Sequence, residues 1–366
     1  MTYQVSMRDV ARAAGVSVSA VSLALRNSPK ISADRRDAVL KIAEELGYRR
    51  DPRITELMEH LRTARPQRAS STIAMIIPEL TREQLAHYPP IQGLIEGARE
   101  IAAVAGFGLD VFHLTDPGMS PRRVRQILLA RGVKGVLIAP CASGVARINF
   151  DCTGLCVATA GYSIIEPRLH RACPDYLQMM DELIADCTER GYHRVGLVMT
   201  YGEGGIGQKL FTSSFLYWQS TISSAERIPV LPKVQITPEN LRRWFDRYRP
   251  EVIISAGSVF ATLEEIGLRV PRDVAFASID VSQSPTDAAG ADHRYNLVGR
   301  EALKQVLTML NLNLTGVPDS PKVVLVDSHR REGYTLPTKR AAAPVKPTRR
   351  ARASKKPEPA FRGFVD

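Results

Sequence analysis

The chain has 366 residues, of which 44% are hydrophobic and 24% are charged. This length predicts two or three domains, and the composition is that of an ordinary globular protein. The sequence contains no run of eighteen uncharged apolar residues, which excludes a membrane-spanning helix. The first fifteen residues lack the long apolar run and cleavage site of a secretory signal, so we expect a cytoplasmic protein with no membrane partner.

The net charge of +11 is concentrated at the two ends of the chain. Residues 1–68 hold 13 Lys/Arg against 8 Asp/Glu, and residues 338–366 hold 9 against 2, whereas the middle has 27 against 28. Two basic ends predict contact with a polyanion; the alternative is that they only aid solubility. The five cysteines lie in the neutral middle without zinc-finger spacing, so we expect buried, reduced thiols and neither a metal nor a cofactor.

Three short helices are predicted in the first fifty residues. Ser6 and Asp9 form a capping-box pattern for a helix through Ala14, which Gly15 ends. Ser17 can cap a second helix over residues 18–26, and Ser32 a third with a helical apolar stripe. Helix, tight turn, helix and bracing helix form a helix-turn-helix unit, whose second helix lies in the major groove of DNA.

The stretch MRDVARAAGVSVSAVSLALRNSPKISADRRDAVLKIAEELGY resembles the DNA-binding headpiece of the lactose repressor (LacI/GalR) family of bacterial transcriptional regulators. Many features match at fixed offsets over forty residues: Asp9-Val10-Ala11, Ala14-Gly15-Val16-Ser17, Val21-Ser22, Asn27, Ile31-Ser32, Arg35, Val39 and Leu46-Gly47-Tyr48. The resemblance implies sequence-specific binding to double-stranded operator DNA.

The same resemblance assigns the base-reading positions to Val18, Ser19 and Leu23. Relatives commonly carry an arginine at the third position, which can grip guanine with two hydrogen bonds, whereas leucine cannot. Leu23 either packs on a thymine methyl group or has lost contact with the bases. The full predicted DNA-binding set is Arg8, Ser17, Val18, Ser19, Ala20, Ser22, Leu23, Asn27, Arg35, Arg53 and Leu57.

Residues 51–71 match the hinge helix and linker of the family. Asp51 can act as the N-cap and Pro52 suits the first turn. Leu57 matches the leucine that, in relatives, wedges into the minor groove and kinks the duplex. The sequence departs from the family at Ile54, where alanine is usual, and at Glu56, which adds a negative charge near phosphates. The alternative is a plain linker helix with Leu57 in a local core.

From residue 72 the pattern changes to short apolar runs, such as TIAMIIP, GVLIAP and EVIISAG, that alternate with helical segments. This alternation predicts parallel sheets covered on both faces, in two α/β subdomains. Residues 72–337 resemble the family's effector-binding and dimerisation domain, which is similar to periplasmic binding proteins. The resemblance implies a two-lobed core whose chain crosses between lobes near 162–165, 282–292 and 320–326.

Ligands of open α/β sheets bind outside the carboxyl ends of the strands, which here line an interlobe cleft. The predicted effector-binding residues are Leu80, Tyr162, Lys209, Asp280 and His293. Lys209 lies near the place of a family arginine, and Ala256-Gly257 replaces a family aspartate, so we expect the cleft to hold something less polar than a hexose, or nothing.

Two enzyme-like signals carry no catalytic assignment. GEGGIGQK at 202–209 departs from a phosphate-binding loop, because Gln208 separates the last glycine from the lysine, and it is interpreted as a cleft-edge loop. The histidines and acids show no spacing of a triad or metal set, so we expect no enzyme.

Residues 338–366 are rich in Pro, Ala, Lys and Arg and predict a disordered basic tail, which either holds DNA non-specifically or is an inert extension. The domain prediction is therefore 1–50 headpiece, 51–71 hinge and linker, 72–337 core and 338–366 tail.

These features together predict a LacI-type repressor that binds a pseudo-palindromic operator as a homodimer. A small-molecule effector, such as a sugar or a related metabolite, would modulate it from the interlobe cleft. Two alternatives stay open: a small-molecule receptor of the binding-protein type with a vestigial DNA role, and an effector-independent regulator with a degenerate pocket.

Overall fold

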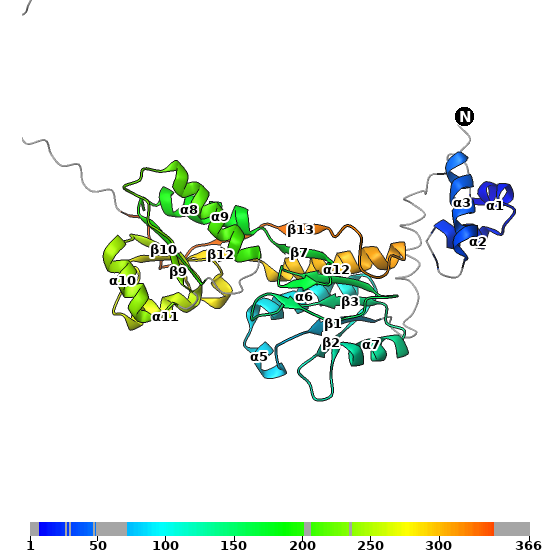
Figure 1. The fold of residues 1–366 in the computed structure, drawn as a ribbon, viewed down its shortest axis with the longest axis horizontal. Helices are drawn as coiled ribbons and strands as arrows, with labels where there is room; N and C mark the ends of the chain where they lie inside the picture. The colour runs from blue at the N-terminus through cyan, green and yellow to red at the C-terminus, as the bar shows by residue number, and fades with distance from the viewer. Residues whose placement is uncertain are drawn as a thin grey trace, which may run out of the picture.

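The computed structural model describes residues 7–25, 28, 31–46, 48, 72–200, 206–233 and 236–339. They form a three-helix headpiece and an α/β core of two lobes (Figure 1). Within these ranges, no helix is both long enough and apolar enough to cross a bilayer. The predicted hinge at 51–71 and the predicted tail from 340 onward lie outside the described residues.

The headpiece helices pack around small side chains. Their bounds are α1 Met7–Ala13, α2 Val18–Leu25 and α3 Ala33–Glu45. The fully or nearly buried residues are all valine or alanine, which lets short helices cross closely: Val10, Ala11, Val21, Ala24, Val39 and Ala43. The all-α headpiece is therefore confirmed, although Ser32 stands at the N-cap of α3 without the side-chain cap bond that we expected.

The first lobe is built on a six-stranded sheet in the order β13-β7-β5-β3-β1-β2, in which all neighbours are parallel. Its strands are β1 Thr72–Ile77, β2 Gly108–His113, β3 Gly135–Ile138, β5 Cys156–Ala160, β7 His170–Pro174 and β13 Val323–Val326. The helices are α5 Arg82–Ala86, α6 Pro89–Val104, α7 Pro121–Ala130 and α12 Tyr295–Leu312, and β4 Ala146–Arg147 pairs with β6 Ile164–Glu166. Apolar clusters cover both faces of the sheet, as a parallel sheet requires.

Helices α6 and α12 approach each other so closely that only glycine fits at the contact. A Cβ on Gly97 would lie 1.8 Å from the carbonyl oxygen of Asn296, and one on Gly299 would lie 2.2 Å from that of Leu94. Both obstacles are backbone atoms of the facing helix, so neither can swing aside. The C-terminal helix of the first lobe is thereby fixed against the first long helix, two hundred residues earlier in the chain.

The second lobe is built on the sheet β14-β12-β11-β10-β8-β9, which is parallel except where β14 joins β12. Its strands are β8 Val195–Thr200, β9 Leu231–Lys233, β10 Val252–Ser255, β11 Ala275–Ser278, β12 Gly290–Asp292 and β14 His329–Arg331. Its helices are α8 Tyr176–Glu189, α9 Ile206–Thr221, α10 Pro238–Tyr248, α11 Gly257–Glu265 and the 3₁₀ turn η1 Val281–Gln283. Two mainly parallel sheets confirm the predicted α/β core of two subdomains.

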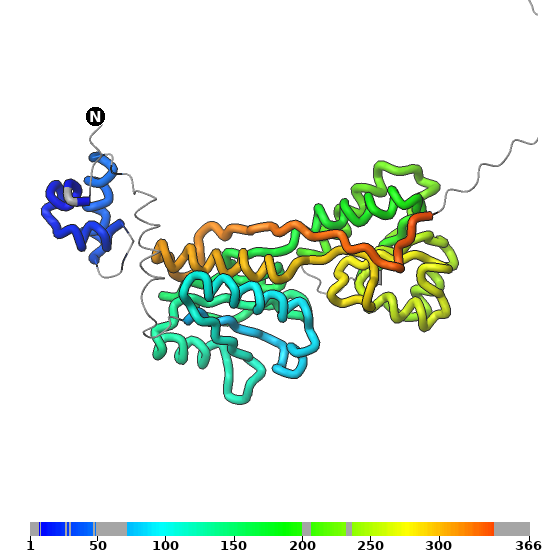
Figure 2. The backbone as a smooth tube through the Cα atoms, turned by 180° about the vertical axis from the view of Figure 1, so that it is seen from behind, coloured from blue at the N-terminus to red at the C-terminus, as the bar shows by residue number. Residues whose placement is uncertain are grey.

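The chain crosses between the lobes three times, as expected, and each crossing lies on the C-terminal side of its predicted position. They lie between β7 and α8, between β12 and α12, and between β13 and β14, at residues 174–176, 292–295 and 326–329 (Figure 2). The predicted crossing at 162–165 was wrong because β7, with the sequence HRACP, is a further strand of the first lobe. Its charged first residues concealed a strand whose last four residues are buried.

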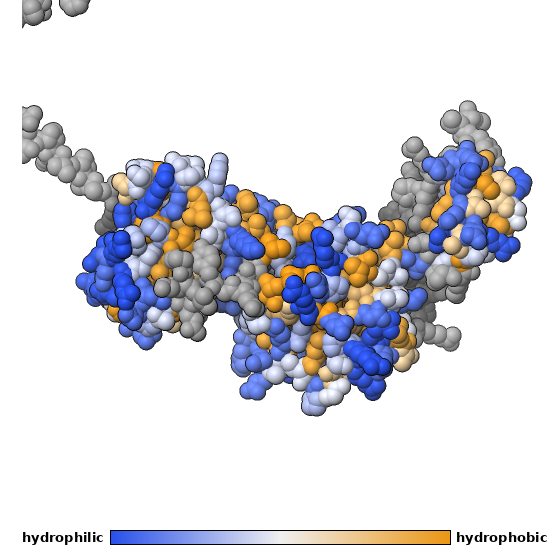
Figure 3. Space-filling view, in the orientation of Figure 1, coloured by the Kyte–Doolittle hydropathy of each residue, from blue (hydrophilic) through white to orange (hydrophobic). Residues whose placement is uncertain are grey.

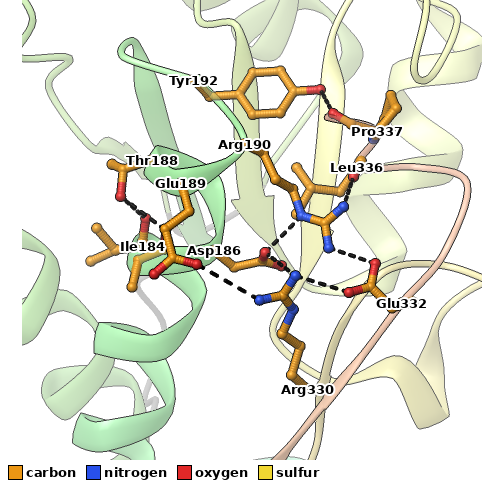
Figure 4. A network of polar contacts seen from close by, with 11 residues as sticks. Ile184, Asp186, Thr188, Glu189, Arg190, Tyr192, Arg330, Glu332, Leu336 and Pro337 are labelled. Carbon is orange, nitrogen blue, oxygen red and sulfur yellow. Dashed lines mark hydrogen bonds and ion pairs between the residues drawn. The ribbon is translucent and has the colours of Figure 1, made fainter. Parts of the chain in front are cut away.

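The segment 329–339, which we call the C-terminal strap, is held on the second lobe by a charged network (Figure 4). Asp186 is 3% exposed and pairs with Arg190 at 2.6 Å and with Arg330 at 2.7 Å. Glu332 joins the same two arginines, and Arg190 also donates to the carbonyl of Leu336. The strap therefore reaches Lys339, whose amide donates to the carbonyl of Arg190, so the first two residues of the predicted tail are placed on the lobe.

All five cysteines are buried and none forms a disulfide. Burial raises the pKa of each thiol, for example to about 11 at Cys152 and about 12 at Cys141. Neutral, unreactive thiols fit the expected structural role.

Candidate nucleic-acid interface and interlobe cleft

The turn between α1 and α2 is fixed by local bonds that the sequence predicts. Gly15 takes a φ of 62°, a conformation that favours glycine, and the amide of Val16 donates to the carbonyl of Ala11 at 3.0 Å. The hydroxyl of Ser17 accepts from the amide of Ala20 at 3.1 Å, which confirms the predicted N-cap of α2. This cap sets where the second helix begins and therefore which of its side chains point outward.

Helix α2 divides its side chains between the core and the surface. Val21 and Ala24 are 0% and 1% exposed, whereas Val18 is 40% exposed and Ser19 is also exposed. Leu23 is half-buried and lies one helical turn beyond Ser19, on the same face. Neither Ser19 nor Leu23 belongs to the buried core, so both can meet a molecule that approaches the headpiece.

The other predicted DNA-binding residues fall into three groups. Ala20 and Ser22 are half-buried on α2, and Arg35 is exposed in the first turn of α3. Arg8 lies on α1, but its side chain is outside the description. The remaining ones, Asn27, Arg53 and Leu57, lie outside the described residues. In the space-filling view, the visible face of the headpiece mixes hydrophobic and hydrophilic side chains (Figure 3).

In the second lobe, the predicted cleft residues Asp280 and His293 belong to one hydrogen-bonded cluster. The carboxylate of Asp280 accepts from Ser282, Gln283 and the hydroxyl of Tyr295, the last at 2.8 Å. The ring of His293 bonds to the carbonyl of Ile279 at 2.6 Å and to the hydroxyl of Tyr295 at 2.8 Å. Because Tyr295 begins α12 of the first lobe, this cluster ties the two lobes together at the second crossing.

On the first lobe, Leu80 and the residues beside it are also held by hydrogen bonds within the protein. The carbonyl of Leu80, a predicted effector residue, is bonded by the ring of His113 and by Thr115, at 2.9 and 3.2 Å. Burial opposes the ionisation of Glu79, but hydrogen bonds from the hydroxyl and amide of Ser143 outweigh it and lower the pKa of that carboxyl. Burial, and then the charges of Asp280 and Glu79, raises the pKa of the Tyr88 hydroxyl, so Tyr88 stays neutral between the two lobes' acids.

Aromatic rings form a chain between the two lobes. The ring of Tyr162 lies 6.1 Å from that of Tyr176, which meets Phe211 edge-on at 5.1 Å and His293 at 5.8 Å. The guanidinium of Arg171, which is 8% exposed, stacks on Tyr162 at 5.6 Å and donates to two backbone carbonyls. Lys209, the last predicted effector residue, is exposed on the first turn of α9.

Tyr176, Phe211 and Tyr295 were missed in the sequence analysis. Tyr176 follows the strand HRACP and the N-cap residue Asp175. This position could have marked Tyr176 as a residue at the end of a strand, but only if β7 had been recognised as a strand. Phe211 and Tyr295 meet Tyr176 and Asp280 through the packing of α9 and α12, which no local pattern reveals.

Comparison with known proteins identifies the N-terminal segment. A family model described as "Bacterial regulatory proteins, lacI family" matches residues 6–51. The N-terminal segment of the chain therefore carries a LacI-family domain. It is similar to the transcriptional regulator GalS of Salmonella typhimurium, with 56% identity over 45 residues, which are 12% of this chain and 13% of GalS. It is also similar to the transcriptional repressor CytR of Escherichia coli, with 22% identity over 335 residues, 83% of this chain and 89% of CytR.

Solved structures show a likeness in fold that extends from the headpiece to the core. The regulator CelR in complex with cellobiose aligns with 91% of this chain and 100% of its own, at a TM-score of 0.53 and 18% identity. A LacI-family protein from Rhizobium etli aligns with 73% of this chain and 99% of its own, at a TM-score of 0.54 and 16% identity. At these identities the structures establish the fold of the two-lobed core.

Proposed function

We propose that this LacI-family regulator is a repressor that binds a pseudo-palindromic operator as a homodimer. The observation that carries the proposal is the division of α2, which buries Val21 and Ala24 and leaves Val18 and Ser19 exposed, with Leu23 half-buried beside them. In a helix-turn-helix unit this outward face lies in the major groove. Two-fold symmetry of the dimer would be mirrored in the two halves of the operator.

The chemistry of the outward face supports recognition by hydrogen bonds and apolar contact. The hydroxyl of Ser19 can bond to a base edge or a phosphate, and the branched side chain of Leu23 can pack on a thymine methyl group. Arg35 is exposed at the start of α3, where a cation can bind a phosphate and fix the register of the headpiece. Arg53 and Leu57 would act in the hinge, with Leu57 as the minor-groove wedge.

The two-lobed core supports control by a small molecule in the cleft. CelR has a core of the same fold and is solved in complex with cellobiose. A ligand changes DNA affinity only to the extent that it prefers one arrangement of the lobes. The saturation of Asp280 and His293 by internal bonds favours a second candidate, a regulator of the same kind whose cleft needs no external effector.

The experiment that tests DNA recognition compares selected operator sites for the full chain and for Ser19→Ala and Leu23→Ala. We expect each variant to keep its fold by circular dichroism and to lose preference at one base step per half-site. Leu129→Ala is the control, because Leu129 is 48% exposed and lies on α7 of the core, away from the headpiece. Site profiles that stay the same in both headpiece variants would contradict the assignment of the outward face of α2.

A further inference from the structure

The ring of Tyr176 occupies the place where the two lobes meet. Tyr176 is the first residue of α8, directly after the chain leaves the first lobe at Pro174. Its ring contacts Tyr162 of the first lobe and both Phe211 and His293 of the second. A Cβ built on Gly207 of α9 would lie 3.4 Å from two ring carbons, so the ring also rests on the backbone of α9.

These contacts form a slot shaped for one aromatic ring. Phe211 and His293 meet the ring of Tyr176 at 77° and 75°, the edge-to-face geometry that aromatic pairs prefer. Gly207 also faces the ring, and a Cβ at that position would be in van der Waals contact with it. Burial raises the pKa of the Tyr176 hydroxyl, so the ring stays neutral at physiological pH.

Polar side chains of Asp280, of His293 and of the strand ends beside them already have partners within the protein. Asp280 and His293 bond to one another through Tyr295. At the carboxyl ends of the strands, the hydroxyl of Ser255 donates to the carbonyl of Val198, and that of Ser278 bonds to Ser284. No buried side-chain nitrogen or oxygen within the described residues lacks a hydrogen-bond partner. The hydroxyls of a sugar would have to displace these bonds, whereas a ring would not.

We propose that the interlobe cleft is a binding site for a single aromatic ring, and that the chain fills it with its own Tyr176. The inference rests on the proposed function, because it requires the lobe arrangement bridged by Tyr162, Tyr176 and His293 to be the one that binds operator. An external effector of this protein would be a small phenol-like molecule that competes with the Tyr176 ring, rather than a polyol. Tyr176 is thus a positioning residue for the lobes, and acts on DNA only through them.

The test removes the ring of Tyr176 by substitution and then supplies a similar ring as a free molecule in solution. Tyr176→Gly leaves an apolar vacancy between Phe211, His293 and Tyr162, and such vacancies bind small aromatic molecules. We expect the full-length variant to bind operator about tenfold more weakly, because edge-to-face contacts that favour one lobe arrangement are lost. The probe is p-cresol, which is the tyrosine side chain without its backbone. It should raise the Tm of the variant and restore its operator affinity.

Matched controls distinguish the effect of losing the Tyr176 ring from the effect of other changes at the same place. Tyr176→Phe keeps the ring and should bind operator like the wild type. Leu177→Ala alters the next residue of the same turn, which is 47% exposed, and should also leave operator affinity unchanged. Cellobiose at the same concentration should shift neither the Tm nor the operator affinity of Tyr176→Gly.

Three results would overturn the inference: operator affinity unchanged in Tyr176→Gly, a variant whose loss p-cresol does not reverse, or a Tm shift with cellobiose instead. If Tyr176→Gly does not fold, Tyr176→Leu takes its place, because leucine keeps apolar volume without a ring. Wild-type operator affinity in Tyr176→Leu would equally contradict a need for the ring. Failure of the proposed function is distinct, since the wild-type chain itself would then bind no operator.

Discussion

In the proposed recognition helix α2, a leucine on the outward face limits the chemistry available for reading base edges. Leu23 is half-buried between the exposed surface and the headpiece core, so its methyl groups can contact DNA but can form no hydrogen bond. Replacing Leu23 with arginine adds a guanidinium that can bond to O6 and N7 of guanine at once. We expect Leu23→Arg to gain a preference for guanine at one step per half-site, worth about 1–3 kcal/mol of discrimination.

Selection of binding sites from random DNA would measure this change. The control is Leu129→Arg, which adds the same charge on α7 of the core and should raise only non-specific affinity. If the selected sites of Leu23→Arg match those of the wild type, Leu23 does not face the groove.

Asp186 is the residue on which the C-terminal strap depends. Its carboxylate is 3% exposed and neutralises both Arg190, which is 11% exposed, and Arg330, which is 41% exposed. Removing it leaves the buried guanidinium of Arg190 with Glu332, whose side chain is 68% exposed, as its remaining carboxylate partner. We expect Asp186→Ala to lower the free energy of unfolding by about 2–3 kcal/mol, since the exposure of Arg330 reduces the full penalty of a buried pair.

Urea unfolding followed by circular dichroism would check this value. Glu189→Ala is the matched control, because Glu189 is on the same helix and 4.0 Å from Arg330, but its side chain is 73% exposed. It should change the free energy of unfolding by less than about 0.5 kcal/mol. Equal effects of the two substitutions would mean that burial of Asp186 does not matter to the strap.

At the scale of elements, the contact between α6 and α12 is the most restrictive in the first lobe. A methyl group on Gly97 or Gly299 would collide with a backbone carbonyl of the facing helix, at 1.8 and 2.2 Å. Overpacking costs about 1–3 kcal/mol when neighbours can adjust, and here they are backbone. We therefore expect Gly97→Ala and Gly299→Ala each to reduce stability by at least about 2 kcal/mol.

Gly93→Ala provides a graded comparison on the same helix. Its Cβ would lie 3.0 Å from the Cβ of Tyr295, a side-chain atom, and 3.4 Å from the nearest backbone atom. Thermal unfolding of the three variants should rank Gly93→Ala as the mildest. The reverse order would show that α12 can move away from α6.

Elements that are bounded by capping or turn residues were predictable from the sequence. Elements that are defined by contacts with other strands and helices were not. Gly15 and the capping hydroxyl of Ser17 fix the first two helices within a residue or so of their predicted bounds. Strand β7 was hidden by its charged first residues, and β12, with three residues, is too short to show any periodicity. The crossings between lobes were misplaced for this reason, since each follows a strand or precedes a helix that only the sheet order reveals.

The residues of the candidate site differ in the same way in how far the sequence alone predicts them. Ser19 and Leu23 follow from the position of one short helix, and Asp280 from the end of one strand. Tyr176 needs three segments that are distant in the sequence, at residues 162, 211 and 293, before its role appears. A sequence motif records a local arrangement, whereas the aromatic slot exists only between lobes.

For the whole molecule, the separation of charge remains the strongest sign of how it meets DNA. The core is nearly neutral, while residues 1–68 carry a net charge of +5 and residues 338–366 a net charge of +7. Each phosphate contact releases counterions, so the logarithm of operator affinity should fall steeply and linearly with the logarithm of salt concentration. The basic C-terminal segment would add to this slope if it touches DNA.

Removing residues 340–366 tests that contribution, because the strap ends at Lys339 and its bonds to Arg190 and Glu251 stay in place. We expect the shortened chain to bind random DNA more weakly and with a shallower salt dependence, while its preference among operator sequences is unchanged. Electrostatic contacts outside the headpiece carry no sequence information, which is why affinity and specificity should separate. Gel shifts of operator and random duplexes between low and moderate salt would measure both. The same slope and affinity in the shortened chain would assign the C-terminal charges a role other than DNA binding.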